Sequence, residues 1–306
     1  MRKHDRDIFF KLVRGKVLFN ELLSRHTSFK IGGPAEIWIE PADVIELRLI
    51  LTYARMNSHP VFIIGNGSNL LVSDNGVTGF VLKLSAHEFK KIEVVNETVV
   101  VGGAVQLSHL IEKMCSLGLS GLEPFVGIPG SIGGSVFMNV GAWDAQFGDY
   151  VQSATIMQSD GSIVNLDKDE LGFEYRTCKG IETGIVLDVV LDLAKASKEE
   201  IEKRFKKYSD ARTDSQPKGS SAGCVFKNNN EIPTGRLIDK LGLKGTRIGG
   251  AVVSDTHANF IVNDNQATAR DVVDLMKKIK ARVLEVEGIH LEPEIKFIGE
   301  GNYAAF

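Results

Sequence analysis

One cysteine in the chain is surrounded by small residues. Residues 220–228 read SSAGCVFKN, in which Cys224 follows an alanine and a glycine and precedes a valine and a phenylalanine. Cysteine is commonly a small buried hydrophobe, and its apolar neighbours favour that interpretation. The small residues before it leave room for a ligand, however, and Lys227 and Asn228 supply polar partners. A proton-donating thiol is therefore the alternative, and these nine residues alone do not decide.

Two glycine-rich segments are candidates for holding a phosphate-bearing cofactor. They are IIGNGSNLLVSDNG at residues 63–76 and GIPGSIGGSVFMNVGAW at residues 127–143. Glycines expose backbone N–H groups and permit positive φ, so successive amides can converge on phosphate oxygens. A tight turn, or close packing of two elements, is the structural alternative. The first segment matches neither GxGxxG followed by a helix nor GxxxxGK[ST], so the usual dinucleotide-binding and P-loop interpretations fail.

The hydrophobic pattern predicts an α+β chain that positions these segments. Strands are predicted at residues 35–39, 61–64, 97–101, 154–157, 163–166, 185–193 and 291–297. Helices are predicted at residues 41–56, 107–117 and 197–212, and after the sequence Thr268-Ala269-Arg270-Asp271, which resembles a capping box. We expect three compact parts, at residues 1–86, 87–197 and 198–306.

Composition narrows the class of protein. The chain has 306 residues, 43% of them hydrophobic and 25% charged, with a net charge of −3. This balance provides no bulk attraction for nucleic acid or an anionic membrane, so small-molecule chemistry is favoured. The charged N-terminus lacks the apolar run of a signal peptide, and we expect a cytoplasmic protein. The three cysteines, Cys115, Cys178 and Cys224, are widely spaced, which predicts neither a disulfide framework nor a metal site. Cys115 lies in a helical pattern and is predicted to belong to the core.

Several stretches, in order along nearly the whole chain, together resemble the UDP-N-acetylenolpyruvoylglucosamine reductase family. Each stretch is modest alone, but their order makes the resemblance specific. Besides the first glycine-rich segment, they are HTSFKIGG (26–33), GLEPFVGIPGSIGGSVFMNVGA (121–142), FEYR (173–176), SAGCVFKN (221–228), LIDKLGLKGTRIGGAVVSDTHANFIVN (237–263) and LEPEIKFIG (291–299).

The resemblance implies a fold and a reaction. Two lobes of the vanillyl-alcohol-oxidase (PCMH) type would hold FAD, and a smaller C-terminal α+β domain would close over the substrate. The implied reaction reduces UDP-N-acetylglucosamine enolpyruvate to UDP-N-acetylmuramate, in peptidoglycan precursor synthesis, with NADPH as reductant. Hydride would pass from flavin N5 to the terminal carbon of the enolpyruvyl group. The short link after Arg176 resembles the compact subclass without an extra substrate-binding insertion. We expect a monomer with no nucleic-acid or membrane partner.

The resemblance also assigns three catalytic residues. Cys224 stands where many family members have the serine that donates the proton, and a thiol gives up a proton more readily than an alcohol. Arg176 would hold the substrate carboxylate and the enolate that develops from it, since its planar fork suits a carboxylate. Glu294 would act as a second acid–base or enolate-orienting residue. Glu292, two residues earlier, is the alternative carboxylate, and the motif favours Glu294.

The remaining site residues are also implied by the matched motifs. Tyr175, Asn228 and His257 are candidate substrate contacts, although His257 could equally be a structural histidine. Trp143 and Asp144 depart from the family pattern, which could change one wall of the flavin pocket. The candidate cofactor-binding residues are Gly65, Asn66, Gly67, Ser68, Asn69, Gly127, Ile128, Pro129, Gly130, Ser131, Gly133, Gly134, Asn139, Gly141 and Ala142.

Two other functions remain open from the residues alone. An FAD-dependent sugar or hydroxy-acid oxidoreductase of the same flavoprotein superfamily would keep the cofactor but would not need Cys224. A non-catalytic protein that binds a nucleotide sugar or a flavin is the other alternative. Such a protein has no evident need for Cys224, Arg176 and Glu294 together, which favours the reductase.

Overall fold

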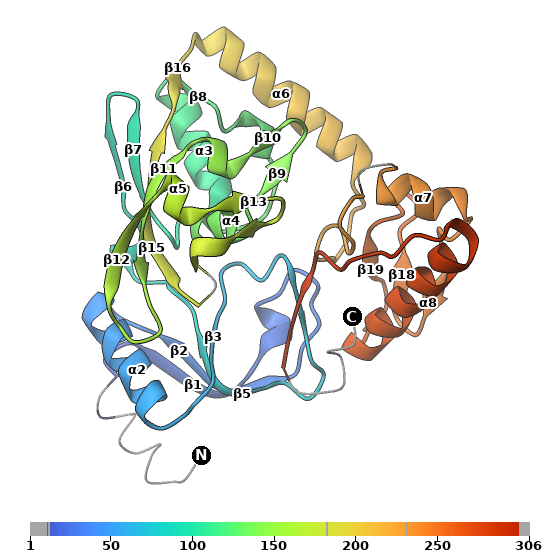
Figure 1. Ribbon diagram of the computed structural model, residues 1–306, viewed down its shortest axis with the longest axis horizontal. Helices are drawn as coiled ribbons and strands as arrows, with labels where there is room; N and C mark the ends of the chain where they lie inside the picture. Colours follow the sequence, from blue (N-terminus) through green and yellow to red (C-terminus); the bar gives the residue numbers. More distant parts are fainter. Residues whose placement is uncertain (1–10, 12, 182, 230–231, 300–306) are drawn as a thin grey trace. The chain divides into compact units, whose positions relative to one another are not determined.

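The computed structural model describes residues 11, 13–181, 183–229 and 232–299. The chain divides into two compact units, each assembled from three stretches of sequence. Unit 1 comprises Met1–Phe19, Ile37–Gly65 and Gly79–Arg212, and unit 2 comprises Asn20–Glu36, Asn66–Thr78 and Thr213–Phe306 (Figure 1). The C-terminal residues therefore fold together with two short segments from the first third of the chain.

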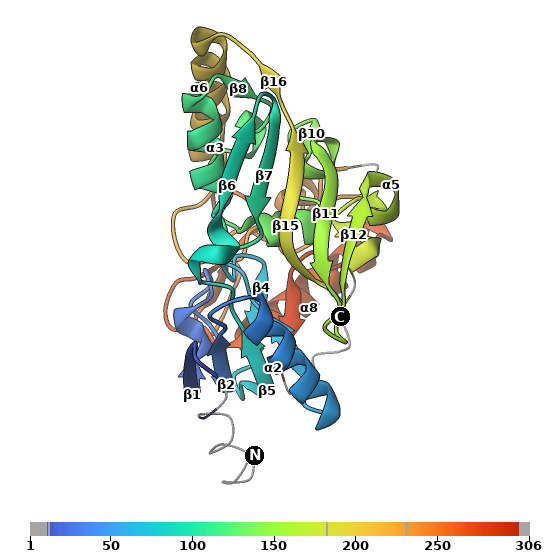
Figure 2. The same cartoon turned by 90° about the vertical axis from the view of Figure 1, so that its left-hand side faces the viewer.

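The largest sheet of unit 1 has five strands in the order β12-β11-β15-β7-β6, and each neighbouring pair is antiparallel (Figure 2). The predicted strands of this region are confirmed with small shifts at their ends. The central strand β15 is apolar along most of its length and mostly buried, as expected of a strand with neighbours on both sides. The strands are β6 (Ile92–Val95), β7 (Thr98–Gly102), β11 (Val151–Met157), β12 (Ile163–Asp167) and β15 (Ile185–Asp192).

Several helices follow or flank this sheet, and the last of them, α6, runs three residues past the end of unit 1. Helix α3 buries one face, formed by Leu107, Leu110, Ile111 and Met114, as its spacing predicts. The charged helix α6 is confirmed and has a single fully buried residue, Ile201. The helices are α3 (Leu107–Ser116), α4 (Ile132–Phe137), α5 (Lys168–Leu171) and α6 (Lys198–Ser215).

The early strands form a four-stranded sheet in the order β1-β2-β5-β3, in which β3 and β5 are parallel. Helix α2 (Val44–Met56) begins three residues later than predicted, because the Asp43 carboxylate accepts the Glu46 N–H at 2.8 Å and so caps the helix. The strands are β1 (Lys16–Leu22), β2 (Pro34–Glu40), β3 (Val61–Ile63) and β5 (Val77–Leu82).

Short antiparallel pairs complete unit 1. Two of them are hairpins that carry predicted site residues at or beside their turns. The pairs are β9 (Gly141–Ala142) with β10 (Ala145–Gln146), β13 (Phe173–Glu174) with β14 (Thr177–Cys178), and β8 (Leu119–Ser120) with β16 (Ala194–Lys195).

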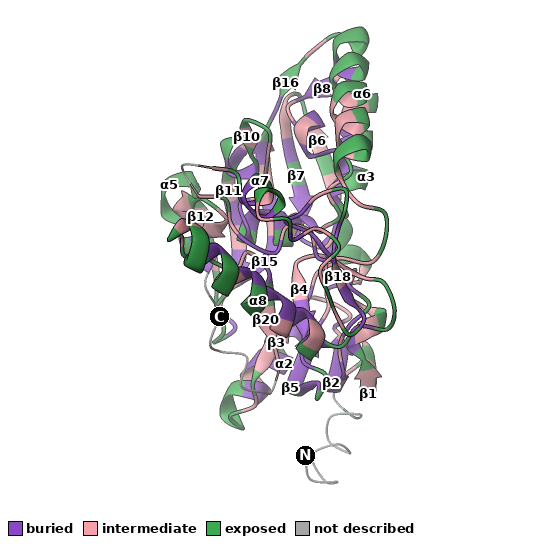
Figure 3. Ribbon diagram, turned by 90° about the vertical axis from the view of Figure 1, so that its right-hand side faces the viewer, coloured by how far each residue is buried: buried purple, intermediate pink, exposed green. Residues whose placement is uncertain are grey.

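Unit 2 has its own hydrophobic core, built on a small antiparallel sheet and two helices. The long helix α8 buries one face and exposes the other (Figure 3). Early residues such as Phe29, Ile31 and Leu71 belong to the same core. The elements are α7 (Thr234–Lys240), α8 (Ala269–Glu287), β17 (Arg247–Ile248), β18 (Ala251–Val253) and β19 (Ile261–Asn263), and β4 (Leu70–Val72) pairs in parallel with β20 (Lys296–Ile298).

The capping box predicted before the last helix is confirmed. The Thr268 hydroxyl accepts the Asp271 N–H, and the Asp271 carboxylate accepts the Thr268 N–H, both at 3.0 Å. Burial raises the pKa of Asp271, but hydrogen bonds from Thr268 and Gly250 outweigh it and leave the pKa below its usual value. The carboxylate is thus held ionised where the helix needs an acceptor.

The strand predicted over residues 291–297 is wrong in its extent. A regular strand covers only Lys296–Ile298, and before it Pro293 makes a single bridge to Phe226. Proline has no N–H to donate to a ladder, which explains the interruption.

The three-part division of the chain at residues 86 and 197 stays a prediction.

Asp74 connects an early segment to the last helix. Its carboxylate accepts the N–H of Ala269 at 2.7 Å and that of Arg270 at 3.1 Å. We predict that Asp74→Ala destabilises the start of α8 by about 1–2 kcal/mol, because two N–H groups lose their acceptor. Amide hydrogen exchange in the first turn should then be roughly 5- to 30-fold faster. Asp274→Ala, on the half-exposed side of the same helix, is the control, and an equal effect there would contradict the prediction.

Candidate active site

Cys224 lies in an extended segment of unit 2 that has hydrogen-bonded neighbours on both sides. On one side, Cys224 bridges to Phe260, and the Val225 N–H donates to the Asn259 C=O at 2.8 Å. On the other, the Val225 C=O accepts the Glu294 N–H at 2.9 Å. The backbone next to Cys224 therefore lies beside the backbone of Glu294, so unit 2 brings these two predicted catalytic residues to adjacent segments.

The buried side chain of Asn259 fixes this arrangement. Its amide oxygen accepts the Phe226 N–H at 3.1 Å, and its amide nitrogen donates to the Phe226 C=O at 2.8 Å. A paired amide of this kind has the geometry of a sheet ladder and cannot be replaced by an apolar residue without leaving two polar groups unsatisfied. His257 in the same motif is a predicted site residue, whereas Asn259 is not, because no local signal in the sequence marks it.

Gly223 leaves space next to Cys224. Its φ of +77° is in the left-handed region, which a residue with a side chain seldom adopts. A Cβ placed on Gly223 would meet no heavy atom within 4 Å among the described residues. The glycine is therefore required by the backbone conformation, and the space that the sequence predicted before the half-buried Cys224 is present.

The two neighbouring carboxylates differ in their surroundings. Glu294 is half-buried, whereas the side chain of Glu292 is 73% exposed and pairs with the Lys227 ammonium at 3.1 Å. The Glu294 C=O also accepts the side-chain amide of Asn69, at 3.2 Å, so the first glycine-rich segment touches the Glu294 backbone. These contacts favour Glu294 over Glu292 as the functional carboxylate.

Asn228 and His257 both have structural contacts in unit 2. The Asn228 amide oxygen accepts the N–H of Thr234, the first residue of α7, at 3.0 Å. The Nδ1 atom of His257 accepts the Asn259 N–H at 3.2 Å, and its ring lies 4.9 Å from the Phe260 ring. Burial, with a smaller effect of Lys244, lowers the pKa of His257, so the imidazole is neutral near neutral pH. The roles of Asn228 and His257 as substrate contacts stay predictions.

Arg176 and Tyr175 form the turn of the β13–β14 hairpin in unit 1. Arg176 has a φ of +58°, a conformation that costs a residue with a side chain of order 1 kcal/mol. Its guanidinium carbon lies 5.2 Å from the centroid of the Tyr175 ring, within cation–π range. The guanidinium is thus presented on a short, constrained turn, as a carboxylate anchor requires.

The first glycine-rich segment has the backbone that a phosphate group needs. Buried Gly67 has a φ of +62°, and a Cβ on it would lie 2.2 Å from the His26 carbonyl oxygen. In the described part of the chain, the N–H groups of Asn66 and Gly67 donate to no protein acceptor. Unused amides in a glycine turn fit the phosphates of a dinucleotide cofactor.

The same segment begins beside the second glycine-rich segment. A Cβ on Gly65 would lie 2.4 Å from the Ser131 hydroxyl oxygen, so any side chain there would displace this hydroxyl. Ser131 in turn caps α4 by accepting the Gly134 N–H at 3.3 Å, and the Gly133 N–H donates to the Gly103 C=O at 2.8 Å. The N–H groups of Gly133 and Gly134 are therefore engaged within the protein, and cofactor contacts of these residues would need other atoms.

Trp143, the last residue of the second glycine-rich segment, packs against helix α6. It lies at the turn of the β9–β10 hairpin with a φ of +57°, and its ring centroid is 5.8 Å from that of Tyr208 in α6. Its side chain is 52% exposed. The contact with Tyr208 explains how an aromatic residue is accommodated at this departure from the family pattern.

The comparisons with known proteins agree with this arrangement. The model of an FAD-binding domain matches residues 35–167, and the model of the C-terminal domain of UDP-N-acetylenolpyruvoylglucosamine reductase matches residues 216–298. The UDP-N-acetylenolpyruvoylglucosamine reductase of Bacillus subtilis is 40% identical, over 93% of this chain and 95% of its own. A reductase of the same name from Symbiobacterium thermophilum, numbered 2, is 43% identical over 93% of each chain.

The chain belongs to the UDP-N-acetylenolpyruvoylglucosamine reductase family. The crystal structure of the enzyme from Thermus caldophilus, 38% identical, covers 93% of this chain and 98% of its own with a TM-score of 0.81. The family, the fold class with an FAD-binding region and a C-terminal domain, and the FAD cofactor are thereby confirmed. Within this reductase fold, Cys224 and Glu294 belong to unit 2, and Arg176 and Tyr175 belong to unit 1.

Two further properties of the reductase chain concern metals and membranes. Among residues 11, 13–181, 183–229 and 232–299, no cluster of three or more His, Cys, Asp or Glu side chains is arranged to hold a metal ion. No helix in these ranges is long and apolar enough to cross a membrane.

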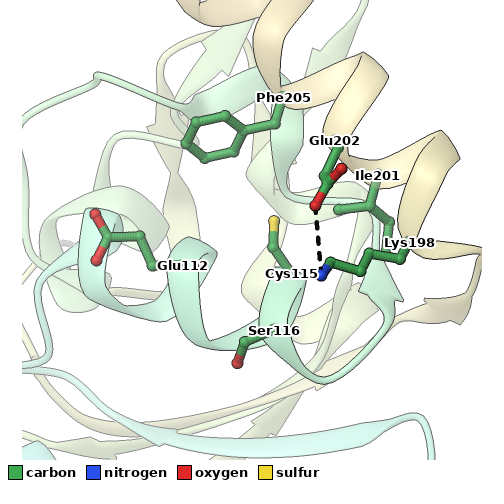
Figure 4. A pocket seen from close by; sticks show the side chains of 7 residues that line it. All are labelled: Glu112, Cys115, Ser116, Lys198, Ile201, Glu202 and Phe205. Carbon is green, nitrogen blue, oxygen red and sulfur yellow. Dashed lines mark ion pairs between the residues drawn. The ribbon is translucent and has the colours of Figure 1, made fainter.

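A cavity of about 310 Å³ lies between α3 and α6, and no predicted site residue lines it (Figure 4). The thiol of Cys115 lines it beside Phe205, so Cys115 lies at the edge of the core rather than inside it. Burial and then the charge of Glu123 raise the pKa of Cys115 to about 11.

Cys178 is fully buried, and its thiol donates to the Leu171 C=O at 3.1 Å. Burial raises the pKa of Cys178 to about 11.

We predict that Cys115 and Cys178 react slowly with iodoacetamide at pH 8. The reactive form is the thiolate, and a thiol with a pKa near 11 is deprotonated roughly a hundredfold less than an ordinary thiol at that pH. Alkylation should rise about tenfold per pH unit up to pH 10, which peptide mass spectrometry measures. The same cysteines in urea are the control. Alkylation of the folded protein as fast as in urea at pH 8 would contradict the raised pKa values.

Proposed function

We propose that this chain reduces the enolpyruvyl group of UDP-N-acetylglucosamine enolpyruvate to give UDP-N-acetylmuramate, with NADPH as the reductant. The observation that carries the proposal is the position of Cys224. This protic residue matches the proton-donating serine of the family motif, and its backbone lies beside that of Glu294. Bound FAD would take a hydride from NADPH and deliver it from N5 to the terminal carbon of the enolpyruvyl group.

Arg176 stabilises the charge that this addition creates. Hydride addition to the terminal carbon leaves negative charge on the neighbouring carbon and its carboxylate. A guanidinium fork binds a planar carboxylate through two parallel hydrogen bonds. Because the turn already holds Arg176 in place, the group needs little reorganisation when the charge develops, which is how electrostatic catalysis becomes effective.

Cys224 completes the reduction by protonating the carbon next to the carboxylate. The S–H bond breaks, a C–H bond forms, and the resulting thiolate takes a proton from solvent before the next turnover. The open space beside Gly223 allows a substrate to approach the sulfur. A thiol in this role carries one liability, because its thiolate can be oxidised.

Glu294 orients the enolate or assists the proton transfer. A carboxylate beside a carbanion repels it unless the carboxylate is protonated or hydrogen-bonded. The half-buried position of Glu294 and the anchoring of its backbone by Val225 and Asn69 suit a group that must keep one orientation. Tyr175, Asn228 and His257 complete the proposed substrate contacts.

The cofactor is held by the two glycine-rich segments in this proposal. The amides of residues 65–69 bind the diphosphate, and residues 127–134 with 139–142 provide close backbone approach to the rest of the molecule. The unused N–H groups of Asn66 and Gly67 support the first part of this assignment. We further propose three domains, at residues 1–86, 87–197 and 198–306, and a monomeric enzyme in the cytoplasm, where NADPH and nucleotide sugars occur together.

Anaerobic single-turnover kinetics of Cys224 variants test the proton donor. We predict that Cys224→Ala slows reoxidation of the reduced flavin by substrate roughly 10²- to 10⁴-fold, the usual contribution of a general acid. Cys224→Ser, which restores the residue of many relatives, should keep most of the rate. Reduction of the flavin by NADPH should be equal in all three proteins, and it serves as the internal control. Equally fast reoxidation in the alanine variant would overturn the role of Cys224.

A further inference from the structure

We propose that Gly141 and Asn139 position the Arg176 guanidinium, and thereby couple the predicted flavin-binding segment to the substrate anchor. The inference rests on the proposed function of Arg176 as that anchor. All three residues belong to unit 1, and the contacts that join them lie within it. The sequence predicts Gly141 and Asn139 only as cofactor contacts.

Gly141 provides the surface on which the guanidinium rests. A Cβ on Gly141 would lie 2.5 Å from the Arg176 Nη1 atom and 3.6 Å from its Cζ atom. Any residue other than glycine at position 141 would therefore displace the guanidinium from its observed place. The backbone itself does not require glycine, because Gly141 does not have a left-handed φ.

Asn139 holds the turn that carries Arg176. Its side-chain nitrogen donates to the Glu174 C=O at 2.9 Å, two residues before Arg176, and to the Gln146 side-chain oxygen at 2.8 Å. Its side-chain oxygen accepts the Gly148 N–H at 2.9 Å. With 2% of its surface exposed, this one amide joins the β13–β14 hairpin to the β9–β10 region. The hairpin cannot shift without breaking the partly buried hydrogen bond between Asn139 and Glu174.

The guanidinium is therefore bounded by groups from two directions. Gly141 lies against Nη1, and the Tyr175 ring lies 5.2 Å from the guanidinium carbon. An arginine that is free in solvent loses several rotatable bonds when it binds a carboxylate, which costs affinity. Holding the fork in advance removes part of that cost, and a displacement of about 1 Å at a reacting group can slow a reaction 10²-fold.

The location of these two residues gives the contact a functional consequence. The sequence NVGA at residues 139–142 belongs to the segment predicted to contact the flavin. The residues that approach the flavin and those that hold Arg176 are thus the same short piece of backbone. The segment sets the position of the Arg176 guanidinium, so a change at residue 141 should affect the substrate step more than the reduction of the flavin.

Gly141→Ala tests the role of the glycine, because the backbone accepts alanine while the guanidinium must move. In the holoenzyme we expect reoxidation of the reduced flavin by substrate to slow roughly 10- to 100-fold. Affinity of the oxidised holoenzyme for substrate, measured by calorimetry, should fall as well. Both half-reactions are measured per bound flavin, and the substrate step should slow more than the reduction by NADPH. Ala145→Gly, on the paired strand β10, is the control for a general disturbance of the hairpin and should leave both half-reactions unchanged.

A double-mutant cycle with Arg176→Ala decides between the possible routes. If Gly141 acts through Arg176, adding Gly141→Ala to Arg176→Ala should change the substrate step less than twofold. An equal loss from Gly141→Ala in both backgrounds would overturn the positioning role while leaving that of Arg176 intact. An Arg176→Ala variant as fast as wild type would instead overturn the anchor itself, and the positioning role with it.

Discussion

Three backbone segments that lie side by side in unit 2 support most of the proposed chemistry. Residues 224–226 are hydrogen-bonded to residues 259–260 on one side and to residues 293–294 on the other. The side chain of Asn259 adds two buried hydrogen bonds to Phe226. Because buried polar groups must keep their partners, this arrangement has little freedom to slip. A slip by one residue would break these hydrogen bonds and change which residues lie beside Glu294.

In unit 1, a strained turn rather than a sheet holds the proposed catalytic side chain in place. Arg176 adopts a left-handed φ of +58°, and the contacts of Asn139, Gly141 and Tyr175 hold it there. Strain of this kind persists only where the surroundings determine the conformation, and it is concentrated at functional sites. Gly141 leaves room for the guanidinium because it has no side chain, and Asn139 links the two hairpins through its side-chain amide.

Local patterns predicted the regular elements well and the irregular ones poorly. The capping box at Thr268 and the apolar face of α3 depend on residues three or four apart, so they are visible in the sequence and were confirmed. The strand predicted at residues 291–297 shortened because Pro293 cannot donate a hydrogen bond. The contribution of Phe29, Ile31 and Leu71 to the core of unit 2 was not predicted, since no local pattern records contacts between residues 150 or more positions apart.

The sequence by itself determined the family, the fold class and the cofactor, because several ordered motifs carry more information than any single spacing. It also pointed to Cys224, Arg176 and Glu294, whose proposed roles come from their positions in the family motifs. Only the tertiary structure decided which neighbours hold these residues. Asn259 beside Cys224, and Gly141 beneath Arg176, are separated from them by 35 positions along the chain. Such contacts form only when the backbone folds. They cannot be predicted from the sequence, because a side-chain amide or a glycine leaves no periodic signal there.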